Sequence, residues 1–112
     1  MSAIAAHPAA HPVQAFEAVV AACRDEPGVI QAKMFGSPGL RVNGKVFACL
    51  VKGQLVVKLP QARVATLLAE GKAQRFDPGM GRLMKEWAAV DPGHNWIALA
   101  EEARAFVAAS AA

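Results

Sequence analysis

Two histidines near the start of the chain are the first residues whose type and spacing could bind a metal. His7 and His11 stand four residues apart, so a helix would place both imidazoles on one face. Pro8 and Pro12 follow them directly, which opposes a helix, and no third ligand comes next. We therefore expect residues 1–12 to form a disordered tail, and we predict no metal site.

Cysteine and histidine elsewhere offer little support for catalysis. Cys23 and Cys49 sit in apolar surroundings, outside any Cys-x-x-Cys pair and with no histidine nearby in sequence. We interpret both as small buried hydrophobic residues, while a nucleophilic or redox role stays open as the alternative. His94 could act as an acid or base, but no partner can be placed beside it, which favours a surface or capping role. We predict no catalytic residue and no cofactor.

Three other patterns resemble functional motifs but have simpler explanations. The run Gly36-Ser37-Pro38-Gly39 lacks the lysine and the following helix of a phosphate loop, so a structural turn is favoured. Glu101 and Glu102 are adjacent and would point about 100° apart on a helix, unlike a catalytic pair. Trp87 and Trp96 are more typical of core anchors than of platforms for base stacking.

Composition indicates a single folded domain. The chain has 112 residues, of which 54% are hydrophobic and 19% charged, and it carries a net charge of +3. Such a chain is too apolar for a disordered protein, and its apolar runs are too short for a membrane span. The start, Met1-Ser2-Ala3-Ile4, has no basic residue before an apolar stretch, so we expect no signal peptide and a cytoplasmic location.

The first half of the chain predicts one helix followed by strands. Apolar residues recur at helical spacing from Val13 until Pro27-Gly28 ends the helix. A strand over 29–34 and a type II turn over 36–39 come next. Asn43-Gly44 is the preferred pair for a two-residue hairpin turn. With Lys52-Gly53 as a second turn, residues 39–59 read as a three-stranded antiparallel meander.

The second half alternates helix and strand. Pro60 suits the first position of a helix that Gly71 ends, and a short strand over 72–76 follows. The pattern of 82–90 fits a helix or a strand. A final helix places Trp96, Leu99, Ala100, Ala103, Phe106 and Val107 on one stripe.

Two sequence blocks resemble a known family. Met34-Phe35-Gly36-Ser37-Pro38-Gly39-Leu40 resembles the Met-Phe-Gly-x-x-Gly-Leu signature of the TfoX/Sxy N-terminal domain family, and the run from Gly81 to Trp87 resembles its Gly-x-x-Met-x-x-Trp segment. Eight residues carry the signature and are expected to be structural: Met34, Phe35, Gly36, Gly39, Leu40, Gly44, Phe47 and Trp87.

The resemblance implies a two-layer α+β fold, similar to the secretion chaperones. Its expected order is a helix, four antiparallel strands, a helix, two strands and a helix, within one domain over residues 13–110. It also implies that 82–90 is a strand and supplies no catalytic residue. We expect a short member that lacks the family's second, helical domain. The implied function is a non-enzymatic binding or regulatory module that acts through an unknown protein partner.

Charge is unevenly distributed along the chain. No acidic residue lies between Glu26 and Glu70, whereas six basic residues do: Lys33, Arg41, Lys45, Lys52, Lys58 and Arg63. A plain explanation is that edge and turn lysines block aggregation. The alternative is a surface for an acidic partner, and binding of nucleic acid through this basic half is the second function that we consider.

The predicted hairpin registers also indicate self-association. Pairing Val42 with Lys45 and Val51 with Gln54 places Leu40, Val42, Phe47, Cys49, Val51 and Val56 on the sheet face opposite the expected helices. Such an apolar face is unfavourable in water. We therefore predict a homodimer through Phe47, Val51 and Val56, with the condition that a bulge in either strand would swap the faces.

Overall fold

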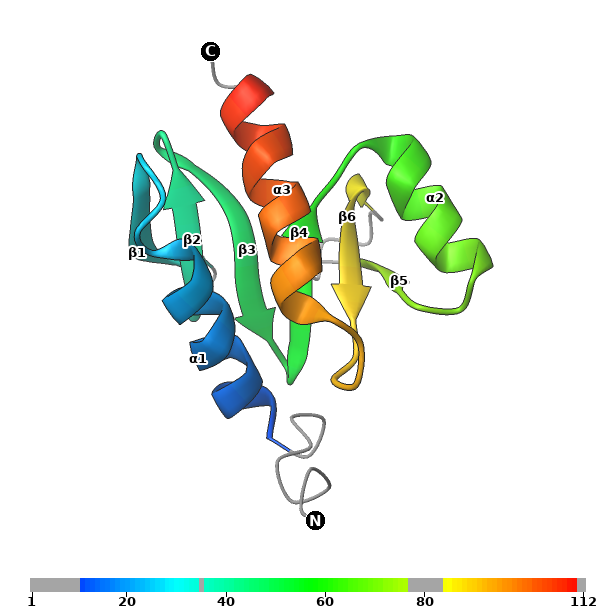
Figure 1. Ribbon diagram of the computed structural model, residues 1–112. Helices are drawn as coiled ribbons and strands as arrows, with labels where there is room; N and C mark the ends of the chain where they lie inside the picture. The colour runs from blue at the N-terminus through cyan, green and yellow to red at the C-terminus, as the bar shows by residue number, and fades with distance from the viewer. Residues whose placement is uncertain (1–10, 35, 77–83, 111–112) are drawn as a thin grey trace.

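The structure, a computed structural model, describes residues 11–34, 36–76 and 84–110. Within these ranges the order of elements is a helix, four strands, a helix, two strands and a helix, which confirms the predicted α+β fold (Figure 1). The elements are α1 (Pro12–Cys23), β1 (Val29–Met34), β2 (Ser37–Val42), β3 (Lys45–Val51), β4 (Gln54–Lys58), α2 (Gln61–Ala69), β5 (Gln74–Phe76), β6 (Met84–Val90) and α3 (Trp96–Ser110).

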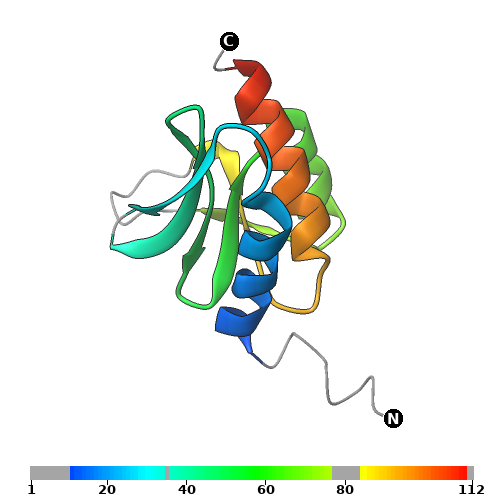
Figure 2. The same cartoon turned by 60° about the vertical axis from the view of Figure 1, so that its left-hand side comes forward.

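The strands form one antiparallel sheet, and the helices lie on one side of it. The strand order is β1-β2-β3-β4-β6-β5, so β1 and β5 are the edges of the sheet among the described residues. Figure 2 shows α1, α2 and α3 on the same side. The strand expected within 82–90 is confirmed as β6, while residues 82 and 83 lie outside the described ranges. Most of the predicted tail, residues 1–10, also lies outside them, and α1 begins at Pro12.

Two hairpin turns follow directly from local sequence. Asn43 and Gly44 have φ angles of 52° and 85°, and Lys52 and Gly53 have 52° and 78°. Positive φ at both turn residues is typical of type I′ turns, whose twist matches that of the flanking strands. Both predicted registers are confirmed by the flanking pairs Val42–Lys45 and Val51–Gln54.

The type II turn predicted for residues 36–39 is wrong. Strand β2 already begins at Ser37, which pairs with Met34 of β1, and it runs through Pro38 and Gly39. Gly36 has a φ of 76°, which suits the reversal between these two strands. Pro38 lies at the start of β2, where the missing N–H costs no hydrogen bond to β1.

A bulge interrupts the pairing of β2 with β3. Arg41 pairs with Val46 and Leu40 pairs with Ala48, so Phe47 is the extra residue on β3. A bulge of this kind shifts the alternation of side chains by one position along the strand.

The bulge corrects the predicted sheet faces. Phe47 is 0% exposed and packs with Leu40 and Val42 in the main core, on the helix side of the sheet. Their assignment to the opposite face is wrong, because it assumed uninterrupted alternation along β3. Val56 does lie opposite the helices, but it is also 0% exposed within the single chain. Phe47 and Val56 therefore offer no contact surface for a dimer.

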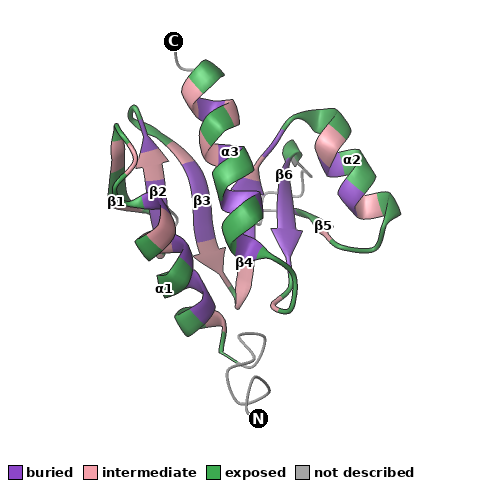
Figure 3. Cartoon of the chain, viewed as in Figure 1, coloured by how far each residue is buried: buried purple, intermediate pink, exposed green. Residues whose placement is uncertain are grey.

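Two apolar clusters stabilise the fold. The larger one joins side chains from all three helices to β2, β3, β4 and β6. Figure 3 shows buried positions along these elements. The smaller one lies on the other face of the sheet and contains Cys49, Val56, Phe76, Trp87 and Ala89, with half-buried Val46 and Val51 packed against it. Each face is thus apolar at its centre.

Candidate functional site

The structure does not gather the predicted basic surface into one patch. Lys45 and Lys52 lie at opposite ends of β3, which separates their backbones by roughly 20 Å. Lys58 lies 3.9 Å from a Glu86 carboxylate oxygen and 5.8 Å from the centre of the Trp87 ring. The six cations therefore occupy several parts of the surface.

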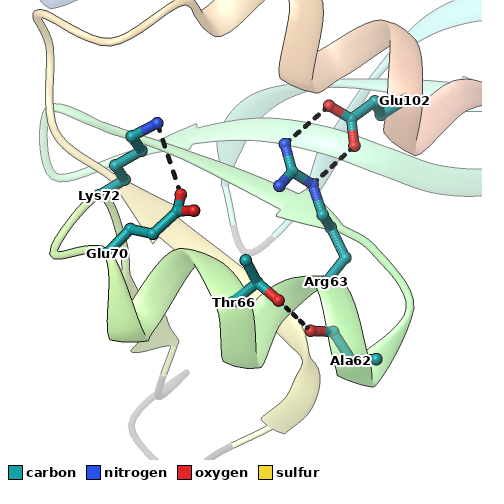
Figure 4. Close-up of polar contacts among 6 residues, drawn as sticks. All are labelled: Ala62, Arg63, Thr66, Glu70, Lys72 and Glu102. Atoms are coloured by element: carbon teal, nitrogen blue, oxygen red, sulfur yellow. Dashed lines mark hydrogen bonds and ion pairs between the residues drawn. The ribbon is translucent and has the colours of Figure 1, made fainter.

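Arg63 is engaged within the fold. Its Nε donates to Oε1 of Glu102 at 2.9 Å and its Nη2 donates to Oε2 at 3.1 Å, so α2 is tied to α3 (Figure 4). Glu102 is thus occupied by this pair, and both Glu102 and its neighbour Glu101 are exposed. Because this bidentate pair fixes the guanidinium and uses two of its five N–H donors, Arg63 is less available to a ligand than an unpaired cation.

The cysteines are unreactive by position. Cys49 is 0% exposed, and burial raises the pKa of its thiol to about 12. Burial also raises the pKa of Cys23, with a smaller contribution from the Glu101 carboxylate. A neutral, enclosed thiol is a poor nucleophile and metal ligand. No group of three histidine, cysteine or acidic side chains that could hold a metal occurs within the described residues.

The remaining candidate residues have structural surroundings. His94 is exposed ahead of α3, and the neighbouring Asn95 side chain caps that helix by accepting from Ala98 N–H at 3.1 Å. Trp96 is buried and its indole N–H donates to the Asp91 carbonyl at 3.0 Å. Trp87 is 7% exposed and belongs to the smaller cluster.

The family-signature residues that the structure describes occupy structural positions. Leu40 and Phe47 are core side chains, and Gly44 forms a turn. A Cβ on Gly39 would lie 3.1 Å from the Ala48 carbonyl oxygen, so the close pairing of β2 with β3 favours glycine there. Phe35 and the side chain of Met34 lie outside the described part of the chain.

A groove between α1 and the β1–β2 hairpin is the best candidate for a binding site. It encloses about 660 Å³. Strands β1, β2 and β3 form one wall through Gln31, Ala32, Lys33, Pro38, Gly39 and Leu50. Helix α1 and the residue that follows it form the other wall through Val13, Phe16, Glu17, Val20, Ala21 and Arg24. We call this hollow the α1–β1 groove.

Apolar surface dominates the α1–β1 groove. Val13 is 61% exposed, which is unusual for a large apolar side chain, and Val20 and Leu50 are only half buried against the main core. Glu17 and Lys33 are exposed on opposite walls. An open apolar hollow rimmed by charged side chains is typical of a surface that binds another protein.

Sequence reasoning missed this groove. The stripe that contains Val13 and Val20 predicted a core-facing helix, and it did not show that α1 leaves part of the sheet uncovered. The exposure of Val13 results from where α1 packs, and no local pattern encodes that position.

A protein-family model matches most of the chain. The model of the TfoX N-terminal domain matches residues 22–110. The chain belongs to the TfoX N-terminal domain family. The matched span includes the β1–β2 wall of the groove and all strands, whereas most of the α1 wall precedes it. A search of curated proteins finds no match. None of the helices in the described residues of this family member is long and apolar enough to cross a membrane.

Proposed function

We propose that this TfoX N-terminal domain protein is a non-catalytic binding module whose α1–β1 groove holds an apolar segment of a protein partner. The groove is the observation that supports this proposal, because Val13 is exposed there and Val20 and Leu50 are only half buried. A partner that covers this surface would remove apolar area from water, which is favourable by about 25 cal/mol per Å² of area buried.

Charge supports a protein partner over nucleic acid. Phosphate backbones need several cations on one surface. Lys58 and Arg63 pair with carboxylates, and Lys45 and Lys52 flank the two ends of β3. Of the six cations, this leaves Lys33 and Arg41 on the β1–β2 pair. A salt series with duplex and single-stranded DNA separates the two functions. Affinity that falls steeply with salt would replace the protein-binding proposal by the nucleic-acid one.

A matched pair of variants tests the groove. Val13 is the second residue of α1, and Ile97 is the second residue of α3, 38% exposed and outside the groove. A glutamate at either position lies near a helix N-terminus, where its charge is tolerated. The wild type serves to capture partners from cells that express it, and each captured protein is then purified and titrated against the variants.

We expect Val13→Glu to weaken the purified partner's binding about ten-fold or more, and Ile97→Glu to leave it near the wild-type value. Equal affinity of the wild type and Val13→Glu would contradict the groove as the binding site. The predicted homodimer is a separate proposal, which light scattering tests; its contact cannot use Phe47 or Val56.

A further inference from the structure

Strand β1 forms a free edge beside the α1–β1 groove. All six of its residues pair with β2 without a register shift. On its other side, no strand pairs with it within the described ranges. An edge strand of this length presents backbone donors and acceptors that a further strand can use.

The hydrogen-bond pattern shows which groups of β1 point outward. Asn43 N–H donates to the Gly28 carbonyl at 3.1 Å, immediately before β1 begins. Bonded and non-bonded pairs alternate along an antiparallel ladder. Ile30 and Ala32 therefore bond to β2, whereas the N–H and C=O of Gln31 point away from it.

Lys33 is the second outward-facing position. It pairs with Pro38, which has no N–H to donate, so a non-bonded pair at this point leaves no donor missing from the β1–β2 ladder. Gln31 and Lys33 thus present two N–H groups and two carbonyls along the open edge. Both residues also line the α1–β1 groove.

Cations outnumber carboxylates around this edge, because Lys33, Arg24 and Glu17 line the groove and Arg41 lies on the opposite face of the sheet. Among the described residues, Lys33, Arg41 and Arg24 form no ion pair. Arg41 is the cross-strand partner of Ile30, and the Ile30 side chain is 57% exposed. The Nε of Arg41 is buried without a hydrogen-bond partner in the described structure. A second copy would add the same positive charges to this edge, whereas an acidic segment would neutralise them, so the acidic segment is favoured over self-pairing.

We propose that β1 accepts an extended, acidic segment of a partner protein as an additional edge strand. The inference rests on the proposed function and specifies its mode. Main-chain hydrogen bonds to Gln31 and Lys33 hold the segment. Apolar side chains on one face of the bound segment lie at the edge of the groove, and carboxylates on its other face lie near Arg41.

Short peptides that alternate valine with glutamate are the probe, with valine–lysine peptides as the matched control. Amide hydrogen exchange is followed by NMR at millimolar peptide. We expect exchange at Gln31 and Lys33 to slow about ten-fold with the glutamate peptide, while Ile30 and Ala32 change little. We also expect the lysine peptide to bind about ten-fold more weakly. Equal binding of both peptides, or unchanged exchange at Gln31 and Lys33, would overturn the proposal.

A protein variant tests the backbone contact directly. Gln31→Pro removes an outward N–H and no β1–β2 bond, and proline is tolerated on an edge strand. We expect it to weaken binding of the glutamate peptide about ten-fold, whereas Gln31→Ala, which keeps the N–H, stays near wild type. If Gln31→Pro does not fold, N-methylation of alternate peptide residues removes the same bonds from the other side. Undiminished binding of the N-methylated peptide would then refute strand addition.

The two proposals fail in different ways. A natural partner that is sensitive to Val13→Glu but indifferent to Gln31→Pro would overturn strand addition and keep the groove. A partner indifferent to Val13→Glu would overturn the groove. Without peptide, amide exchange at Gln31 and Lys33 that slows as the protein concentration rises would identify a second copy as the occupant. That result would overturn the proposal of an acidic segment.

Discussion

The bulge in β3 makes a quantitative prediction about two adjacent residues. Phe47 is 0% exposed in the main core, whereas Val46 is half buried on the other face. An unbulged strand that kept its pairing with β4, and so kept Ala48 on the helix side, would reverse these two positions. Replacing each residue by alanine therefore measures which of the two faces the helices.

The expected costs differ several-fold. An enclosed phenylalanine ring buries roughly 150–200 Å², which at about 25 cal/mol per Å² corresponds to about 4–5 kcal/mol. Phe47→Ala should therefore lower the free energy of unfolding by about 3–5 kcal/mol. Val46→Ala removes two carbon atoms from a half-buried site and should cost about 0.5–1 kcal/mol.

Urea denaturation followed by far-ultraviolet circular dichroism provides the assay. Domains of this size are typically stable by about 5–15 kcal/mol, so both variants should have measurable folded baselines. An unchanged denaturant slope would show that only stability has changed. A larger loss for Val46→Ala than for Phe47→Ala would refute the bulge and the sheet faces derived from it.

Three further predictions concern the thiols, a turn and the α2–α3 contact. Because the pKa of Cys49 is raised from 9.0 to about 12, the native thiol stays neutral while the unfolded chain ionises. The free energy of unfolding should then fall by about 1.4 kcal/mol per pH unit as the pH rises from about 9 to about 12, and Cys49→Ala should remove this component in urea titrations. Lys52 holds a φ of 52°, so Lys52→Asn should stabilise the protein by up to about 1 kcal/mol in thermal or urea unfolding, and a destabilised variant would argue against the turn. A double-mutant cycle of Arg63→Ala and Glu102→Ala should give a coupling of about 0.2–1 kcal/mol that shrinks with salt, because both side chains are partly exposed; a coupling of zero would mean that the pair does not form in solution.

Much of the fold is readable from short stretches of sequence. The turn at Asn43-Gly44 was predicted correctly because these residues tolerate positive φ, a property of the residues themselves. Gly71 ends α2 for the same reason, with a φ of 73°. The buried stripe of α3 follows from spacing alone, since helical geometry fixes which side chains share a face. The segment 84–90 was ambiguous by pattern, and the family resemblance identified it as a strand.

The candidate site could not be predicted in the same way. Its parts are visible in sequence as an apolar helix, a short strand and scattered cations, but their juxtaposition is not. Lys58 and Arg63 belonged to a continuous basic run, and packing brought each one beside a carboxylate from a distant segment. Cations close in sequence were thereby separated on the surface.

Local sequence by itself determined the two hairpin turns, the end of α2 and every element except β6, because these depend on the φ preferences and spacing of neighbouring residues. Tertiary structure alone decided the rest. The bulge at Phe47 depends on how β3 fits between β2 and the helices, and it decides which side chains of β3 face the helices. The α1–β1 groove and the open edge of β1 exist because α1 covers only part of the sheet, an outcome of packing between segments far apart in the chain.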